Sequence, residues 1–215
     1  MLGQSITKNG LLLGLFAIFT TGVIAGTYLS TRGLVQDNIR AAEERALLEI
    51  LPRDTHDNSM LDDAVALNNS ELLGLRDTRN AYRARLNGSV EAVILPATAR
   101  DGYTGDIDLI IGIKRDGSIA GVRVLSHRET PGLGGEVDNP NWKALWPGKK
   151  VYDEGDAKIQ LIKGSVDANT AEAEHKVDGL SGATLTSRGV TNLLQFWMGE
   201  NGYKPFLSNL QSGEA

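Results

Sequence analysis

The clearest pattern in the chain is an uncharged apolar run near the N-terminus, over residues 11–29. As an α-helix this run is about 28 Å long, close to the roughly 30 Å hydrocarbon thickness of a bilayer. A cleaved signal peptide has a shorter apolar core, and no small-residue cleavage site directly follows this run. We therefore expect residues 1–32 to form an uncleaved anchor with one membrane span. The flanking charges, Lys8 before the run and Arg32 and Arg40 after it, do not decide its orientation.

A helical repeat of apolar positions continues beyond the anchor until Pro52. The repeating residues are Val35, Ile39, Ala42, Ala46 and Ile50. Spacings of three and four residues predict an amphipathic helix that leads from the membrane to a soluble domain, although a solvated linker helix fits the same pattern. We assign residues 33–76 to this helix and to a polar connecting segment.

From about residue 77 the apolar positions alternate with polar ones, which is typical of half-buried strands. Asn87-Gly88 and Asp116-Gly117 interrupt the alternation with residues that tight hairpin turns prefer. A further short strand is expected over residues 158–162. The alternating positions are Tyr82, Ala84, Leu86, Val90, Ala92 and Ile94 around the first turn, and Ile107, Leu109, Ile111, Ile113, Ala120, Val122 and Val124 around the second. Two hairpins predict a mostly antiparallel sheet and an α+β fold with flanking helices.

The period returns to that of a helix near Ser187. The apolar stripe of this helix consists of Val190, Leu193, Leu194 and Trp197. We expect the helix to dock on the sheet, with its tryptophan in the core, and to end at Gly199 or Gly202. A soluble domain over residues 77–210 and a tail over residues 211–215 complete the expected organisation.

Composition and charge narrow the functional classes. The chain has 22 Lys and Arg against 27 Asp and Glu, a formal net charge of −5, which argues against nucleic-acid binding. It has no cysteine, so disulfides, thiolate metal sites, Cys-ligated iron–sulfur clusters and cysteine nucleophiles are excluded. The three histidines, His56, His127 and His175, show no metal-ligand spacing, and no metal site is expected.

Two glycine-rich segments carry the candidate chemistry. Residues 178–187 read DGLSGATLTS before the last predicted helix, and residues 129–135 read ETPGLGG after the second hairpin. Small residues let the backbone approach a ligand closely, and the amides and hydroxyls at a helix start attract phosphate. The residues alone also fit an ordinary loop with a hydroxyl N-cap in the first case and a surface turn in the second. Neither segment matches the serine-hydrolase elbow or the dinucleotide-binding glycine pattern.

Taken together, these segments resemble the FMN-binding domain family. SGAT at residues 181–184, with Asp178 before it and LTS after it, is similar to the flavinylation motif of that family. GYTG at residues 102–105 and ETPGLG at residues 129–134 are similar to its earlier blocks, in the same order. The length and the single N-terminal span are most similar to the G subunits of Rnf (Rsx) electron-transport complexes. The resemblance covers roughly residues 1–210.

The resemblance implies a cofactor and the way it is attached. A dedicated, Mg-dependent flavin transferase would move FMN from FAD to Thr184, leaving a phosphodiester and releasing AMP. Thr184 would then be an attachment point and not a catalytic residue. The motif read by the transferase would be Asp178, Ser181, Gly182, Ala183 and Thr184. The residues implied to line the flavin are Tyr103, Glu129, Thr130, Pro131, Gly132, Leu133, Gly134, Ser181, Gly182, Ala183, Leu185 and Thr186.

The same resemblance implies a function and a location. The chain would be a redox relay subunit in the inner membrane of a Gram-negative bacterium, held in the lipid by one helix, with its domain in the periplasm. It would assemble with the A, B, C, D and E subunits of a complex that couples electron transfer between NADH and ferredoxin to ion translocation. A covalent tether suits a relay, because the flavin then keeps a fixed distance to its partners in every redox state.

Two alternatives remain open. The C subunit of a sodium-translocating NADH:quinone reductase carries a similar Ser-Gly-Ala-Thr site but is typically longer. From a different class, the chain could be a flavin-free, membrane-anchored interaction module. A flavin-fluorescent band that disappears in Thr184→Ala separates a flavoprotein from such a module, and the co-purifying subunits separate the two complexes.

Overall fold

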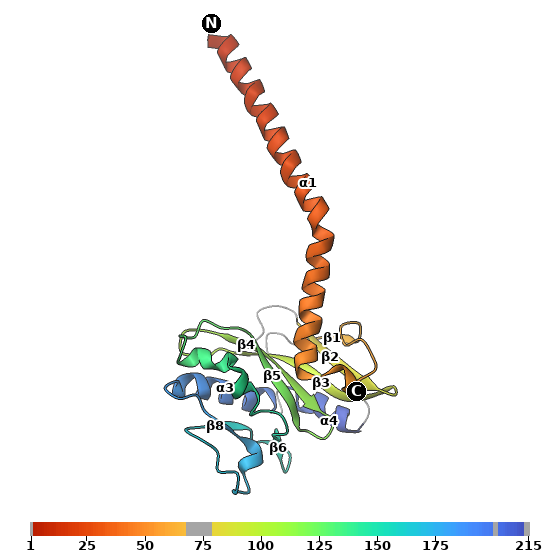
Figure 1. The fold of residues 1–215 in the computed structure, drawn as a ribbon, viewed down its shortest axis with the longest axis vertical. Helices are drawn as coiled ribbons and strands as arrows, with labels where there is room; N and C mark the ends of the chain where they lie inside the picture. Colours follow the sequence, from red (N-terminus) through yellow and green to blue (C-terminus); the bar gives the residue numbers. More distant parts are fainter. Residues whose placement is uncertain (1, 68–78, 200–201, 213–215) are drawn as a thin grey trace. The chain divides into compact units, whose positions relative to one another are not determined.

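The computed structural model describes residues 2–67, 79–199 and 202–212. The chain divides into two compact units, Met1–Glu43 and Glu44–Ala215. In the described residues the first unit is helical, and the second holds the sheet and the remaining helices (Figure 1). The domain limits expected from the sequence stay predictions.

α1 (Leu2–Ile50) is one unbroken helix. Part of it is long and apolar enough to cross a membrane, and the large apolar side chains from Ile6 to Ile39 are exposed, as lipid-facing side chains are. The hydroxyls of Thr20, Thr27 and Ser30 each donate to a main-chain carbonyl one turn earlier. These bonds satisfy the three hydroxyls within the helix, which a segment surrounded by lipid requires. The expected N-terminal apolar helix is confirmed.

A five-stranded antiparallel sheet forms the centre of the second unit, in the order β1-β2-β3-β4-β5 (Figure 1). Its strands are β1 (Ala64–Ala66), β2 (Asn80–Leu86), β3 (Ser89–Ala99), β4 (Ile107–Lys114) and β5 (Ile119–Ser126). Asn87 and Gly88 join β2 to β3 with φ angles of 52° and 83°, as in a type I′ hairpin turn. In the turn between β4 and β5, the Asp116 carboxylate accepts from the Ser118 amide. Both predicted hairpins are confirmed.

Two short strand pairs lie outside the main sheet. β6 (Tyr152–Asp153) and β7 (Asp156–Ala157) are antiparallel, whereas β8 (Gln160–Ile162) and β9 (Lys176–Asp178) are parallel. The strand predicted over residues 158–162 is present but shorter. Its parallel partner β9 was not expected, because a strand of three residues has too few positions for alternation to appear.

Helical turns and two longer helices complete the second unit. The turns are η1 (Arg53–Thr55), η2 (Gly134–Asp138), α2 (Pro140–Lys143) and η3 (Ala173–His175). The longer helices are α3 (Thr184–Trp197) and α4 (Lys204–Ser212). α3 begins at Thr184 and not near Ser187. The apolar stripe does not reveal this first turn, because its buried residues, Thr186 and Ser187, are polar. It ends just before Gly199, as expected.

The two faces of the sheet bury separate cores. Alternate residues of a strand point to opposite faces, so Leu95 joins the larger core with Trp197, while Ile94 joins the smaller core with Ile50. The larger core contains the apolar face of α3, and the smaller core contains the last turn of α1. This arrangement confirms the α+β fold and the docking of the C-terminal helix through its tryptophan.

Ile50 occupies a notch made by two facing glycines. Gly112 of β4 and Gly121 of β5 are register partners. A Cβ at Gly112 would lie 2.4 Å from Ile50 Cγ2, whereas a Cβ at Gly121 would meet the Ile50 Cα at 3.5 Å, an ordinary contact. Beside the notch, Glu49 forms an ion pair with Arg123. These contacts fix the last turn of α1 on the sheet.

Candidate functional site

Three segments that are far apart in the sequence meet around one pocket of the second unit. They are the loop at residues 102–105, the glycine-rich loop at residues 129–134 and the start of α3. The pocket has a volume of about 350 Å³. Its lining residues are Tyr103, Glu129, Thr130, Leu133, Gly134, Gly182, Ala183, Thr184, Leu185 and Thr186. The two segments singled out in the sequence therefore build one site.

Thr184 is the first residue of α3 and lies exposed at this pocket. Two residues earlier, Gly182 has a φ of 75°, a left-handed conformation that glycine adopts without strain. Ala183, at the N-cap position, supplies no side-chain hydrogen bond, and the first turn contains no acidic residue. The amides of this turn and the positive end of the helix dipole are therefore available to an anion beside the Thr184 hydroxyl.

Glu129 is the buried acidic residue of the pocket, with 5% of its surface exposed. Its Oε2 accepts a 2.7 Å hydrogen bond from the Thr186 hydroxyl. Its Oε1 accepts from the Thr104 amide at 3.0 Å. The Thr104 hydroxyl lies 3.3 Å from the same oxygen and donates its shorter hydrogen bond, of 2.5 Å, to the Arg128 carbonyl. Burial by itself raises the pKa of Glu129, but the hydrogen bonds outweigh burial and hold this pKa below its ordinary value. Glu129 is therefore ionised, and its carboxylate connects the three segments of the pocket through hydrogen bonds from Thr104 and Thr186.

Two glycines are required by the position of that carboxylate. A Cβ at Gly134 would lie 2.2 Å from Glu129 Oε2 and 2.7 Å from Thr186 Oγ1. A Cβ at Gly102 would lie 2.9 Å from Glu129 Oε1 and 2.1 Å from a backbone oxygen of the same loop. Gly102 and Thr104 were not predicted as site residues, and the GYTG block that contains them was the available signal.

Other residues of the SGAT segment and its flanks support the site from outside the pocket. The Asp178 carboxylate accepts from the Val166 amide at 2.8 Å, and the Asp178 carbonyl accepts from the Trp142 indole at 3.1 Å. The Ser187 hydroxyl accepts a 3.0 Å hydrogen bond from the Leu180 amide. These bonds fix the shape of the loop that leads into α3. Ser187 thus braces the loop and does not cap the helix.

The pocket contains most of the residues expected to line a ligand. The expected residues that lie outside its lining are Pro131, Gly132, Ser181 and, from the motif, Asp178. Pro131, Gly132 and Ser181 are exposed, and the φ of Gly132, 76°, turns the loop so that Leu133 and Gly134 face the pocket. Which of these residues contact a ligand stays a prediction.

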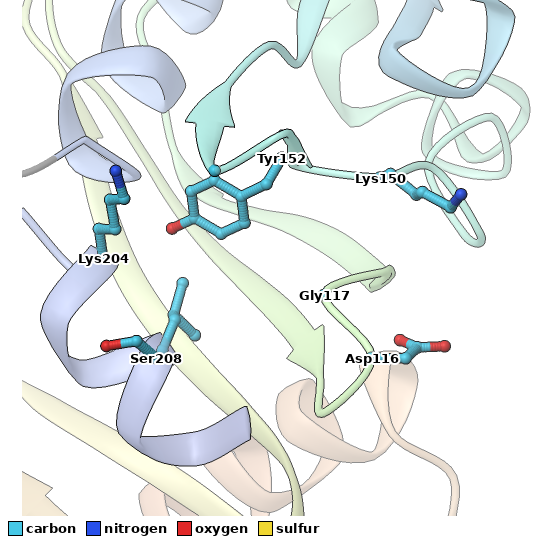
Figure 2. A pocket seen from close by; sticks show the side chains of 8 residues that line it. Asp116, Gly117, Lys150, Tyr152, Lys204 and Ser208 are labelled. Atoms are coloured by element: carbon cyan, nitrogen blue, oxygen red, sulfur yellow. The ribbon is translucent and has the colours of Figure 1, made fainter. Parts of the chain in front are cut away.

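A second cavity, of about 380 Å³, contains none of the candidate site residues (Figure 2). Its lining residues are Asp116, Gly117, Lys150, Tyr152, Gly155, Lys204, Leu207 and Ser208. The Tyr152 hydroxyl donates to the Met198 carbonyl at 2.9 Å, and Lys150 pairs with Glu174 at 2.7 Å. These polar groups therefore already have partners within the protein.

The described residues contain no group of three or more His, Asp or Glu side chains arranged to hold a metal ion. His56 and His175 are buried. The Nδ1 of His175 lies 3.0 Å from the Lys150 carbonyl oxygen. This histidine is therefore hydrogen-bonded within the protein.

Comparison with known proteins identifies the class of this fold and site. Residues 102–199 match the family model of the FMN-binding domain, and residues 1–50 match that of the RnfG N-terminal region. The first match spans every segment of the pocket, and the second covers α1. The fold and the pocket therefore define an FMN-binding domain that follows an N-terminal apolar helix.

Full-length relatives show the family within this class. The chain is 41% identical over 189 residues to the G subunit of the ion-translocating oxidoreductase complex of Pseudomonas aeruginosa strain UCBPP-PA14, covering 87% of this chain and 84% of that protein. It is 37% identical over 189 residues to the corresponding G subunit of Vibrio atlanticus, covering 87% and 86%. The chain belongs to the family of G subunits of ion-translocating oxidoreductase complexes.

The C subunits of Na⁺-translocating NADH-quinone reductases are a related family. The chain is 43% identical over 194 residues to the C subunit of Pseudomonas aeruginosa strain PAO1, covering 89% of this chain and 69% of that protein. The crystal structure of Shewanella oneidensis NqrC is similar with a TM-score of 0.58 and 29% identity, covering 74% of this chain and 73% of that one. This similarity confirms the fold class expected from the hairpins and the C-terminal helix.

Proposed function

We propose that this chain carries electrons within a membrane-bound, ion-translocating oxidoreductase complex, through an FMN attached to Thr184 by a phosphodiester bond. The observation that carries the proposal is the position of Thr184, an exposed hydroxyl at the uncapped start of a helix within an FMN-binding domain. The chain would relay electrons without a reaction of its own. The complex would couple electron transfer between NADH and ferredoxin to ion translocation.

The residues at the start of α3 fit the phosphate end of FMN. The amides of the first turn and the helix dipole stabilise a phosphate within reach of the Thr184 oxygen. An ester bond at the phosphate leaves the flavin ring unchanged, and FMN when bound supplies a centre that takes up and releases electrons. Thr184 would then prevent the cofactor from diffusing away between electron transfers.

Exposed apolar side chains at the same pocket fit the flavin ring of FMN. Tyr103, Leu133 and Leu185 are 68%, 46% and 51% exposed, respectively, and all three line the pocket. A flat aromatic ring placed against these side chains would remove their apolar surface from water. The chain would thereby hold the ring, exclude water from one side of it and fix its distance to redox partners.

Attachment would need a second protein. A Mg-dependent flavin transferase would present FAD to the loop, the Thr184 oxygen would bond to the phosphorus of the FMN half, and AMP would leave as the hydroxyl proton is released. Ser181 and Gly182 are exposed, which supports recognition of the loop by direct contact with the transferase. Asp178 would support recognition through the shape of the loop, because its carboxylate is bonded to the Val166 amide.

The proposed location is the bacterial inner membrane, with the FMN-binding domain in the periplasm. α1, with its one candidate membrane span, would anchor the chain in the lipid. The match of residues 1–50 to the RnfG N-terminal region supports this anchor. The proposed partners are the A, B, C, D and E subunits of the same complex.

A second candidate function is that of the C subunit of a sodium-translocating NADH:quinone reductase. The 43% identity to the Pseudomonas aeruginosa C subunit favours it. The chain covers 69% of that relative but 84% of the G subunit, which favours the G assignment. Purification of the tagged chain from native membranes, with identification of the co-purifying subunits, distinguishes the two complexes.

Flavin fluorescence on a denaturing gel tests the attachment. Co-expression of the full chain with a flavin transferase should give a fluorescent band, and Thr184→Ala should abolish it. Thr130→Ala is the matched control, because it removes another exposed hydroxyl of the same pocket and should keep the fluorescence. A fluorescent band from Thr184→Ala would contradict the proposal.

A further inference from the structure

The carboxylate of Glu129 is the feature of the pocket that attachment at Thr184 leaves unexplained. The donors to its two oxygens belong to the protein: the Thr186 hydroxyl at one oxygen, and the amide of Thr104 at the other. Each oxygen of the carboxylate thus accepts at least one hydrogen bond from the protein. The carboxylate is therefore part of the wall of the pocket and not an acceptor reserved for a ligand.

Glu129 also connects the parts of the pocket mechanically. Thr104 belongs to the loop before β4, and Thr186 belongs to the first turn of α3, the turn that also carries Thr184. Gly134 packs so closely against the carboxylate that a Cβ would overlap it, at 2.2 Å. A change in the position of this carboxylate would therefore move the turn that presents the attachment hydroxyl.

Burial makes the charge of Glu129 effective over distance. With 5% of its surface exposed, Glu129 is screened by water less than a surface carboxylate is. Burial disfavours the ionised form, but the hydrogen bonds from Thr186 and Thr104 outweigh it and lower the pKa of this residue. A fixed negative charge in the wall of a pocket opposes the gain of electrons by a redox group held there.

We propose that Glu129 is a positioning residue whose buried carboxylate holds the start of α3 in place for Thr184 and lowers the reduction potential of the attached flavin. This inference rests on the proposed function. Glu129 acts through Thr186 and Thr104, whose hydroxyl and amide donate to its carboxylate. A purely structural residue would not need the negative charge, which is the feature expected to lower the reduction potential.

The experiment compares two substitutions at this position in the full chain, co-expressed with a flavin transferase and purified in detergent. Glu129→Gln keeps the size of the side chain but removes the charge. Its amide oxygen can still accept from the Thr104 amide, and its NH2 group can donate to the Thr186 hydroxyl in place of the oxygen that accepted from it. We expect near-wild-type flavin loading by intact mass and an upward shift of the midpoint potential, read by spectroelectrochemical titration of the loaded fraction. Glu129→Ala removes the connection as well, and should lower the loading several-fold.

Asp108→Asn is the matched control. The Asp108 carboxylate is also partly buried and also accepts from two hydroxyls, Thr98 at 2.6 Å and Ser126 at 2.9 Å, but Asp108 does not line the pocket. This variant should load normally and keep the wild-type midpoint potential. A shift as large as that of Glu129→Gln would overturn the inference, because the effect would then not depend on the pocket.

Other outcomes are equally decisive. An unchanged or lower midpoint potential in Glu129→Gln overturns the inference. Complete loss of flavin from Glu129→Gln, with normal loading of Asp108→Asn, also overturns it, because the charge would then be required for attachment itself and not for the potential of an attached flavin. A wild-type chain without flavin would instead refute attachment at Thr184, and the inference with it. The mass of the wild-type chain therefore separates the two kinds of failure.

Discussion

The Thr186 hydroxyl donates a 2.7 Å hydrogen bond to the buried carboxylate of Glu129, a residue 57 positions earlier in the chain. This bond joins the glycine-rich loop at residues 129–134 to the first turn of α3. Both ends of it lie in the wall of the pocket at which Thr184 is exposed. The proposed flavin site therefore depends on a tertiary contact as much as on its local motif.

Replacing Thr186 should weaken both the fold and the site. Thr186→Val keeps the shape of the side chain but removes the donor to a buried charge, which typically costs about 1–3 kcal/mol of unfolding free energy. We expect a lower denaturant midpoint and reduced flavin loading, measured by chemical unfolding and by intact mass. Thr186→Ser retains the hydroxyl and should stay close to wild type in both measurements. Equal behaviour of the two variants would show that the hydrogen bond is unimportant.

Gly134→Ala should disrupt the pocket while leaving the hairpins intact. The added Cβ would lie 2.2 Å from Glu129 Oε2 and 2.7 Å from Thr186 Oγ1, so the carboxylate or the loop must move. We expect a several-fold loss of flavin loading by intact mass, with little change in the far-ultraviolet circular dichroism. Gly121→Ala, where the new Cβ meets only ordinary contacts, is the control and should load normally. Normal loading of Gly134→Ala would contradict the geometry of the pocket.

The two glycines that face Ile50 should respond differently to the same change. Gly112→Ala places a Cβ 2.4 Å from Ile50 Cγ2, and overpacking of this kind costs about 1–3 kcal/mol. Gly121→Ala, on the register partner, should change the unfolding free energy much less, because its nearest contact is 3.5 Å. Chemical unfolding of both variants measures the difference. Similar destabilisation by the two changes would mean that Ile50 does not occupy this notch.

Acidification should destabilise the second unit. The pKa of Glu129 lies below its ordinary value of 4.5, since its hydrogen bonds outweigh the effect of burial. A folded-state pKa below the unfolded value means that stability is fully present above the unfolded pKa and is lost as the pH falls through the folded pKa. We therefore expect the denaturant concentration at the unfolding midpoint to decrease when the pH is lowered below about 4.5. Asp63 and Asp108, with lowered pKa values, act in the same direction.

Glu129→Gln isolates the share of this residue in the acid response. The variant cannot titrate at this position, so its denaturant midpoint should depend less on pH than that of wild type. An identical pH dependence in the two chains would show that the Glu129 carboxylate is not stabilised by folding.

Local patterns predicted the fold where an element is long or its turn is distinctive. Alternation around Asn87-Gly88 and Asp116-Gly117 predicted the two hairpins, and the stripe ending at Trp197 predicted the docked helix. The short strands β1 and β9 had no such signal, because three residues neither alternate clearly nor reveal a distant partner. The true start of α3 was missed because the buried residues of its first turn, Thr186 and Ser187, are polar and do not extend the apolar stripe.

The sequence was sufficient to predict which segments form the candidate site, but not how their side chains are arranged within it. The motif resemblance selected the segments around Glu129 and Thr184, and the structure brings both residues to one pocket. The sequence could not indicate that the carboxylate turns inward to Thr186 and Thr104, because the pairing depends on how the sheet places two loops against a helix. The sequence also could not distinguish Asp178, whose carboxylate accepts from the Val166 amide and stabilises the loop, from the residues that line the pocket.

Peptide mass spectrometry of the chain extracted from its native membrane tests the central claim most directly. The account predicts that the peptide containing Thr184 carries the mass of FMN less one water, localised by fragmentation to the Thr184 side chain. The unmodified peptide as the main species, or the same mass increment on another residue, would contradict it.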